Sequence, residues 1–110
     1  MATTYKVLGQ SNPSATTETT LYTVPASSST VVSTIAIANQ AGTAATYRIA
    51  IRPSADASTA EKHWIVYGAT VAASDSTFLT LGITLATGDV IRVYASTANL
   101  SFNAFGSEIA

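Results

Sequence analysis

The first side chain to consider for chemistry is His63, because it is the single histidine among 110 residues. Nucleophilic catalysis needs a nucleophile, a base and an orienting group in contact, and a transition-metal site needs several ligands. Serines are plentiful, but none stands in a Gly-x-Ser-x-Gly motif. His63 alternates with Ile65 and Tyr67, which is typical of one face of a strand. We therefore interpret His63 as a packing or surface residue.

The six carboxylates are scattered over expected turns and strand ends. They are Glu18, Asp56, Glu61, Asp75, Asp89 and Glu108. Asp75 and Asp89 stand in turn sequences, where an aspartate bonds its own backbone. No acidic run has the ligand density of a calcium site, no glycine-rich phosphate loop is present, and the lack of cysteine excludes thiolate ligands. The sequence therefore predicts no catalytic residue, no metal and no cofactor, and a protein that is not an enzyme.

Arginine and tyrosine side chains form the first candidate recognition surface. The outward positions of expected strands carry Arg48, Arg52, Arg92 and Tyr94. Arginine and tyrosine are enriched at protein interfaces, whereas other charged residues are depleted there. We therefore expect these four residues to contact a neighbouring subunit.

Aromatic residues provide the alternative kind of site. Trp64 and Tyr67 lie close together in the sequence and offer flat rings on which a sugar could stack. Aromatic residues at alternating strand positions more commonly pack in a core or an interface. Glycan stacking on Trp64 and Tyr67 is accordingly the second hypothesis.

Alternating apolar residues indicate the elements that position these side chains. Residues 79–85 and 91–95 each alternate with period two, and the turn signal at 86–89 lies between them. This pattern predicts two half-buried antiparallel strands joined as a hairpin, with their apolar faces turned to one core. The core residues expected from this pair are Leu81, Ile83, Ile91 and Val93. Asp89 is expected to form the turn.

Further strands are expected along the whole chain. They cover residues 4–8, 18–24, 30–38, 45–52, 62–67 and 100–104, with a short stretch at 69–72 after Gly68. In the longest of them, alternation assigns Val31, Ile35 and Ile37 to one face and Val32 to the other. Residues 54–61 are expected to form a surface loop with room for one helical turn.

These elements define the fold class. About eight short strands, linked by short turns and without a helical crossover, predict one all-β domain over residues 1–110. We expect an antiparallel β-sandwich of jelly-roll or Greek-key type, with a small closed barrel as the alternative.

The amino-acid composition predicts a surface with few charges for this domain. Charged residues make up 10% of the chain, whereas about 25% is usual. Such a surface is either a neutral, threonine-rich face or a face covered by other subunits, and we favour the second because low charge is a solubility hazard for a free monomer. A net charge of −1 gives no reason to expect nucleic acid or an anionic membrane as partner. We find no secretory signal pattern and no apolar run of membrane-spanning length.

Several strand and turn motifs resemble a known group of proteins. They are LYTVPA at 21–26, IAIAN at 35–39, YRIAIR at 47–52, TGDVIRVYAS at 87–96 and LSFNAFGSEI at 100–109. The pattern is similar to small virion structural proteins of tailed bacteriophages, notably cyanophages, which occur as capsid decoration, neck, tail or fibre components.

The resemblance implies a non-enzymatic building block of the virion, made in the host cytoplasm. Its partners would be copies of itself, in a homo-oligomer such as a trimer, and other virion proteins. The alternative is a host-glycan-binding module of a tail fibre. For an assembly of weakly charged β surfaces we expect little dependence on salt.

Overall fold

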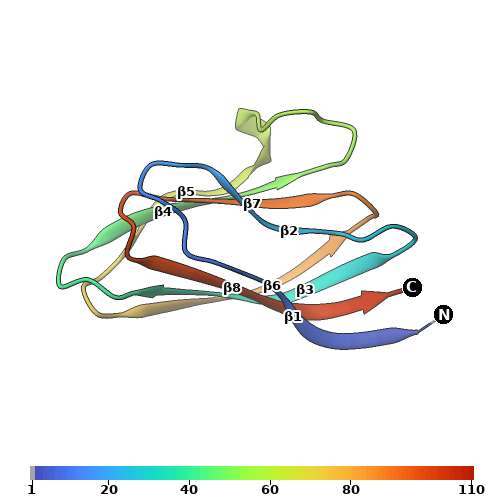
Figure 1. Cartoon of the computed structure of the whole chain (residues 1–110), viewed down its shortest axis with the longest axis horizontal. Coiled ribbons are helices and arrows are strands. Elements are labelled where there is room, and N and C mark those ends of the chain that lie inside the picture. Colours follow the sequence, from blue (N-terminus) through green and yellow to red (C-terminus); the bar gives the residue numbers. More distant parts are fainter. Residues whose placement is uncertain (1) are drawn as a thin grey trace.

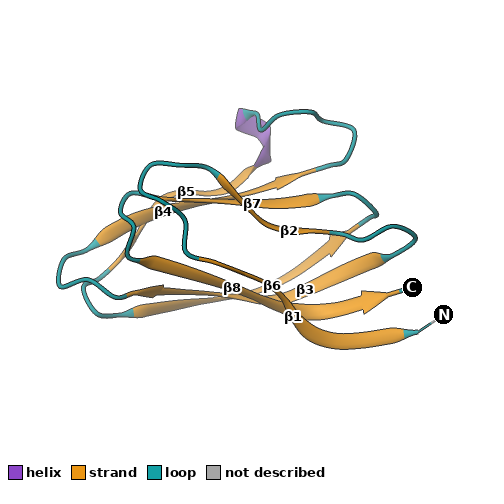
Figure 2. Ribbon diagram, viewed as in Figure 1, coloured by secondary structure: helices purple, strands orange, loops and turns teal. Residues whose placement is uncertain are grey.

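The computed structural model describes residues 2–110, which form eight strands and one short 3₁₀ turn (Figure 2). The elements are β1 (Thr3–Ser11), β2 (Thr19–Thr23), β3 (Ser29–Asn39), β4 (Ala45–Arg52), η1 (Glu61–His63), β5 (Trp64–Val71), β6 (Ser76–Leu85), β7 (Val90–Ala95) and β8 (Leu100–Ile109). The predicted all-β fold class is thereby confirmed, and the strand at 45–52 has the predicted bounds.

The strands form two stacked sheets, with the orders β1-β8-β3-β6 and β2-β7-β4-β5 (Figure 1). Every neighbouring pair is antiparallel. Successive strands change sheet at each connection except the one between β4 and β5, and this order is that of an eight-stranded jelly roll. The sandwich prediction is confirmed, and the closed barrel is not formed.

The expected hairpin of the strands at 79–85 and 91–95 is wrong, because β6 and β7 belong to different sheets. Their apolar faces do share one core: Ile91 and Val93 are fully buried, and Leu81 and Ile83 pack against them. Alternation reports which face of a strand is buried, but it does not identify the hydrogen-bonding partner. The connection is a tight turn in which the Asp89 carboxylate accepts hydrogen bonds from the Ala86 and Ser54 N–H groups, at 2.8 and 3.0 Å.

The faces of β3 also differ from the prediction. A β-bulge at Ser33 breaks the alternation, so that Val32 joins Ile35 and Ile37 in the core and Val31 turns outward. The Ser33 hydroxyl donates to the Phe105 carbonyl at 3.1 Å, which supports the bulge from the neighbouring strand. A bulge adds a residue on one strand of a pair and shifts the following side chains to the opposite face.

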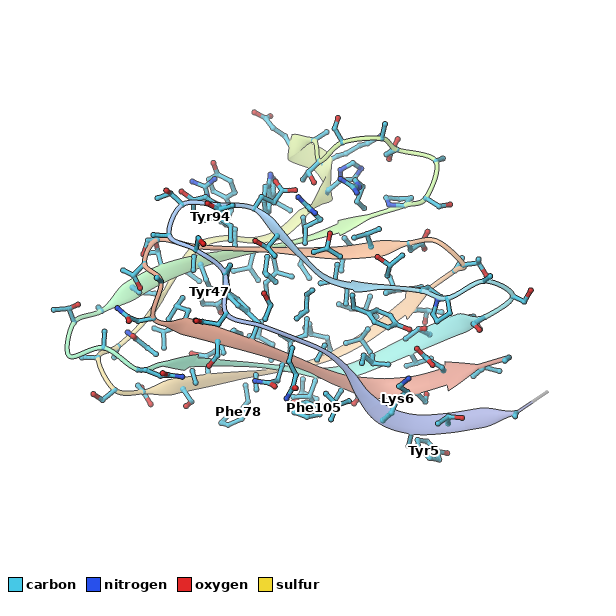
Figure 3. The ribbon with its side chains drawn as sticks, in the orientation of Figure 1. Tyr5, Lys6, Tyr47, Phe78, Tyr94 and Phe105 are labelled. Carbon is cyan, nitrogen blue, oxygen red and sulfur yellow. The ribbon has the colours of Figure 1, made fainter. Side chains whose placement is uncertain are left out.

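The core between the sheets is apolar and well filled. Tyr47 of β4 lies between the sheets (Figure 3). Its ring meets that of Phe102 of β8 edge to face, with the ring centroids 6.2 Å apart. Close packing also dictates glycine at two points. A Cβ on Gly9 would lie 2.1 Å from the Leu21 carbonyl oxygen, and one on Gly106 would lie 2.1 Å from that of Val31.

Most strand ends differ from their predicted bounds, and the largest differences are at β1, β5, β6 and β8. The residues before Trp64 form the 3₁₀ turn, so the strand starts later than expected and then continues through Gly68. β8 extends beyond the expected end at residue 104 because it is paired on both sides, with β1 and with β3.

Candidate interaction surfaces

An arginine–aromatic cluster lies on the outer face of the β2-β7-β4-β5 sheet. The guanidinium carbon of Arg48 is 4.1 Å from the ring centroids of both Tyr67 and Tyr94, and 6.0 Å from that of Trp64. Trp64 and Tyr67 meet edge to face at 5.6 Å. The cluster thus combines two residues expected at a subunit contact with the two expected to stack on glycans.

The strand registers explain why these side chains meet. Arg48 on the central strand β4 lies opposite Tyr94 of β7 on one side and Tyr67 of β5 on the other. Strict alternation would place Trp64 and Tyr67 on opposite faces, but β5 is bulged against β4 and both turn outward. A guanidinium between aromatic rings gains cation–π attraction and holds the rings in place.

The other two predicted contact residues do not join the cluster. Arg92 is engaged within the chain, where its Nε donates to Glu18 at 2.7 Å and its Nη1 donates to the Thr20 hydroxyl. Burial alone raises the pKa of Glu18, but hydrogen bonds from Thr59 and Arg92 and the charges of Arg92 and Arg52 outweigh it, so this pKa is lowered. Arg92 and Arg52 therefore act on charges of their own chain.

His63 is buried in the 3₁₀ turn rather than exposed on a strand. Its Nδ1 accepts a hydrogen bond from the Ala60 N–H at 2.9 Å, and its Nε2 lies 2.8 Å from an Asp56 carboxylate oxygen. Because Nδ1 is an acceptor, the ring proton of the neutral imidazole sits on Nε2 and is donated to Asp56. Both ring nitrogens are used to hold the loop at 53–63.

A hydrogen-bond chain ties the two sheets together at the end near the chain termini. The Tyr22 hydroxyl of β2 is 2.6 Å from a Glu108 oxygen and 2.8 Å from the Thr30 hydroxyl. A carboxylate accepts only, so the Tyr22 hydroxyl donates to Glu108 and accepts a hydrogen bond from the Thr30 hydroxyl. Lys6 approaches the other Glu108 oxygen at 3.3 Å.

The outer face of the β1-β8-β3-β6 sheet is poor in charged side chains among residues 2–110, and Lys6, which is 45% exposed, lies at the rim of a hollow that Tyr5 and Phe105 also line. The four strands contain two charged residues, Lys6 and Glu108, and both belong to the chain that reaches Tyr22 in the other sheet. We call this surface the uncharged face; its large apolar residues are Tyr5, Val7, Phe78 and Phe105. Tyr5 and Phe78 are 84% and 69% exposed, and Figure 3 shows Tyr5, Phe78 and Phe105 pointing away from the other sheet.

Sequence reasoning missed the uncharged face, although its signal was present. Phe78 lies one residue before the alternating strand expected at 79–85. Continued to residue 78, the alternation places its ring on the polar side of the strand, which is expected to face solvent. A large aromatic residue on the outer side of an amphipathic strand indicates a second contact surface. Recognising the other members required the sheet order, because Tyr5 and Phe105 come from opposite ends of the chain.

The described residues contain neither a membrane-crossing helix nor a group of three metal-ligating side chains. The single helical element is a turn of three residues, too short to span a bilayer. No set of three or more His, Asp or Glu side chains within residues 2–110 is arranged to hold a metal ion.

Comparison with known proteins gives a likeness at the level of the fold. No protein-family model matches the chain, and no curated protein matches it. A chain in the structure of the infectious bursal disease virus Gt strain is similar, with a TM-score of 0.50 and 9% sequence identity. The match covers 96% of this chain and 31% of that chain, so this chain spans about a third of the length of its structural neighbour.

Proposed function

We propose that this protein is a non-enzymatic structural component of a tailed-phage virion, which self-assembles and packs on the capsid, neck or tail. The observation that carries the proposal is the uncharged face. Exposed, contiguous apolar surface marks interaction sites in soluble proteins, and charge is depleted at the centre of interfaces. A face that exposes Phe78 and Tyr5, on strands whose two charged residues are tied to each other and to Tyr22, is suited to a protein surface.

The size of the uncharged face is adequate for a specific contact. Four strands about 4.8 Å apart, each with about eight residues of about 3.3 Å, cover about 500 Å². An equal area on the partner gives about 1,000 Å² in total, which is near the lower limit for specific interfaces. A neighbour of this kind would bury the exposed aromatic rings without separating any ion pair.

The fold and the motifs support the same role. Part of a chain in the structure of infectious bursal disease virus is similar in fold to this chain, and jelly rolls are common in viral capsids. The strand motifs at 21–26, 47–52 and 87–96 resemble those of phage virion proteins. The internal use of both His63 nitrogens agrees with a structural role for that residue.

The test combines virion labelling with a face variant. Antibodies against the chain, applied with immunogold to purified virions of a phage that encodes it, are expected to mark one position on the capsid, neck or tail. A double variant, Tyr5→Ser and Phe105→Ser, should keep the thermal transition of the wild type but be absent from virions. Thr70→Ser, on an exposed position of the other sheet, is the matched control and should be incorporated. A wild-type chain that is absent from virions would overturn the proposal.

Glycan binding by a tail-fibre module is the second candidate, because of the arginine–aromatic cluster. Trp64, Tyr67 and Glu61 line a shallow groove beside it, and ring faces next to the donors of Arg48 suit a ligand with apolar and hydroxyl surfaces. A glycan array should then show binding that Trp64→Ala abolishes and Phe78→Ser, on the other sheet, preserves. Failure to bind any host-surface glycan would count against this function.

A further inference from the structure

Strand β6 is an edge strand without a charge or a proline, although its pairing with β3 shifts register once, with the extra residue between Thr80 and Ile83 of β6. It lies at the end of the β1-β8-β3-β6 sheet, and β3 is its one hydrogen-bonded neighbour among residues 2–110. Its sequence, STFLTLGITL, runs for ten residues without a charged residue or a proline. Natural proteins guard edges with charges, prolines, bulges or very short strands, because a bare edge pairs with another strand.

Each edge strand has a register shift against its partner, and the other three edges have one further guard. β1 carries Lys6 and is bulged between Val7 and Gly9. β2 has five residues and a register shift, and β5 is bulged twice against its partner. β6 is therefore the longest of the four edge strands, and a single register shift is its one guard.

The β6 edge also leaves apolar side chains incompletely covered. Phe78 is largely exposed on the outer face. On the inner face, Leu79, Leu81 and Ile83 are only partly buried, although they pack against the core. A strand added at this edge would cover all four side chains and satisfy the free backbone groups of β6.

We propose that the occupant of this edge is β6 of a second copy of the chain, paired antiparallel about a two-fold axis at Thr80. Such an isologous contact is self-complementary by symmetry. Because β6 is uncharged, pairing it with itself places no like charges opposite each other. This contact is one specific form of the self-assembly that belongs to the function proposed above, and it therefore rests on that proposal.

The register follows from the order of large and small residues along β6. With Thr80 opposite Thr80, Phe78 lies across from Gly82, so the ring covers the glycine of the partner strand. On the inner face, Leu79 lies opposite Leu81, which continues the core of each sandwich into the next. Registers offset by one residue would set inward side chains opposite outward ones and are excluded.

The product is a continuous sheet of eight strands. Both copies then present their uncharged faces on the same side, because the two-fold axis is perpendicular to the sheet. The pairing therefore doubles the area that is available to a virion partner.

Cysteine cross-linking tests the register directly, because the natural chain has no cysteine. Directly opposed residues of antiparallel strands have Cα atoms about 4.5 to 5.5 Å apart, which is within disulfide range. Thr80→Cys should therefore form a covalent dimer under mild oxidation. Thr84→Cys is the matched control, equally exposed on the same strand, but the two copies would lie about 26 Å apart and should stay unlinked.

Solution mass supplies a second measurement. The wild type is expected to sediment as a dimer, and Thr80→Lys should weaken the dimer by at least about tenfold, since two ammonium groups would meet at the axis. Phe105→Ser, on the same face but away from the edge, should leave the dimer intact. Thermal transitions equal to that of the wild type show that the variants fold.

The outcomes separate this proposal from the virion role. A monomeric wild type at the highest soluble concentration, or cross-linking of Thr84→Cys as fast as Thr80→Cys, would overturn the β6 contact. Labelled virions together with such a monomer would refute the edge contact and leave the virion role standing. A β6 dimer that is absent from virions would refute the virion role and leave the edge contact standing.

Discussion

At the scale of single residues, side chains of one type have different roles, depending on the residues around them. Arg92 neutralises Glu18 and is held within the chain, whereas Arg48 lies between two tyrosine rings and remains half-buried at the surface. Tyr22 and Tyr5 differ in the same way. The Tyr22 hydroxyl is buried between the sheets, whereas the Tyr5 side chain is almost fully exposed. The environment rather than the residue type assigns the role.

Tyr22→Phe should lower the free energy of unfolding by about 1–3 kcal/mol, because it leaves the fully buried Thr30 hydroxyl without its acceptor. Urea unfolding at neutral pH would measure the loss. Tyr5→Phe is the control, since it removes an exposed hydroxyl, and it should change stability little. Equal losses in the two variants would contradict the role of the buried chain.

The same substitution should change the alkaline stability profile. Burial, followed by the hydrogen bond to Glu108, raises the pKa of Tyr22 from 10.0 to about 12. The unfolded chain therefore ionises first, and stability that is complete below pH 10 is lost as the pH rises towards 12. Burial also raises the pKa of Tyr47, so Tyr22→Phe should reduce this loss without removing it.

At the scale of elements, alternation predicted burial well wherever a strand is regular. The strand at 45–52 has the predicted bounds, with Tyr47 and Ile49 inside, although Ala50, the neighbour of Ile49, is buried as well. The prediction failed at bulges, because an extra residue inverts the faces beyond it: Val31 and Val32 exchanged sides at Ser33. The composition of a strand contains no reliable mark of a bulge, since the neighbouring strands impose it.

The sequence indicated only part of the candidate surfaces, because alternation shows which way a side chain points but not which strands lie side by side. Arg48 and Tyr94 were placed outward correctly, but their meeting with Tyr67 depended on the strand order β7-β4-β5. The expected hairpin of β6 and β7 concealed the fact that β6 is an edge. Strand partners are set by the packing of the whole sandwich, which local patterns do not contain.

At the scale of the whole molecule, charge is distributed unequally between the two sheets. The β2-β7-β4-β5 sheet and the loop at 53–63 hold Arg48, Arg92, Glu18 and the Asp56–His63 pair. The opposite sheet has two charged residues, which pair with each other, and it exposes aromatic rings (Figure 3). The molecule therefore has one face suited to water and polar ligands and one face suited to burial.

This asymmetry predicts how the assembly responds to salt. If the uncharged face and β6 hold the copies together, the binding free energy comes from apolar burial and backbone pairing, which ions do not screen. The sedimentation coefficient should then stay constant from about 0.15 M to about 1 M sodium chloride, although the screening length falls from about 8 to about 3 Å. Arg48→Ala should likewise leave the assembly unchanged, and Thr80→Lys should weaken it most at low salt. Dissociation at moderate salt, together with a weaker assembly of Arg48→Ala, would instead assign the contact to the arginine-bearing sheet.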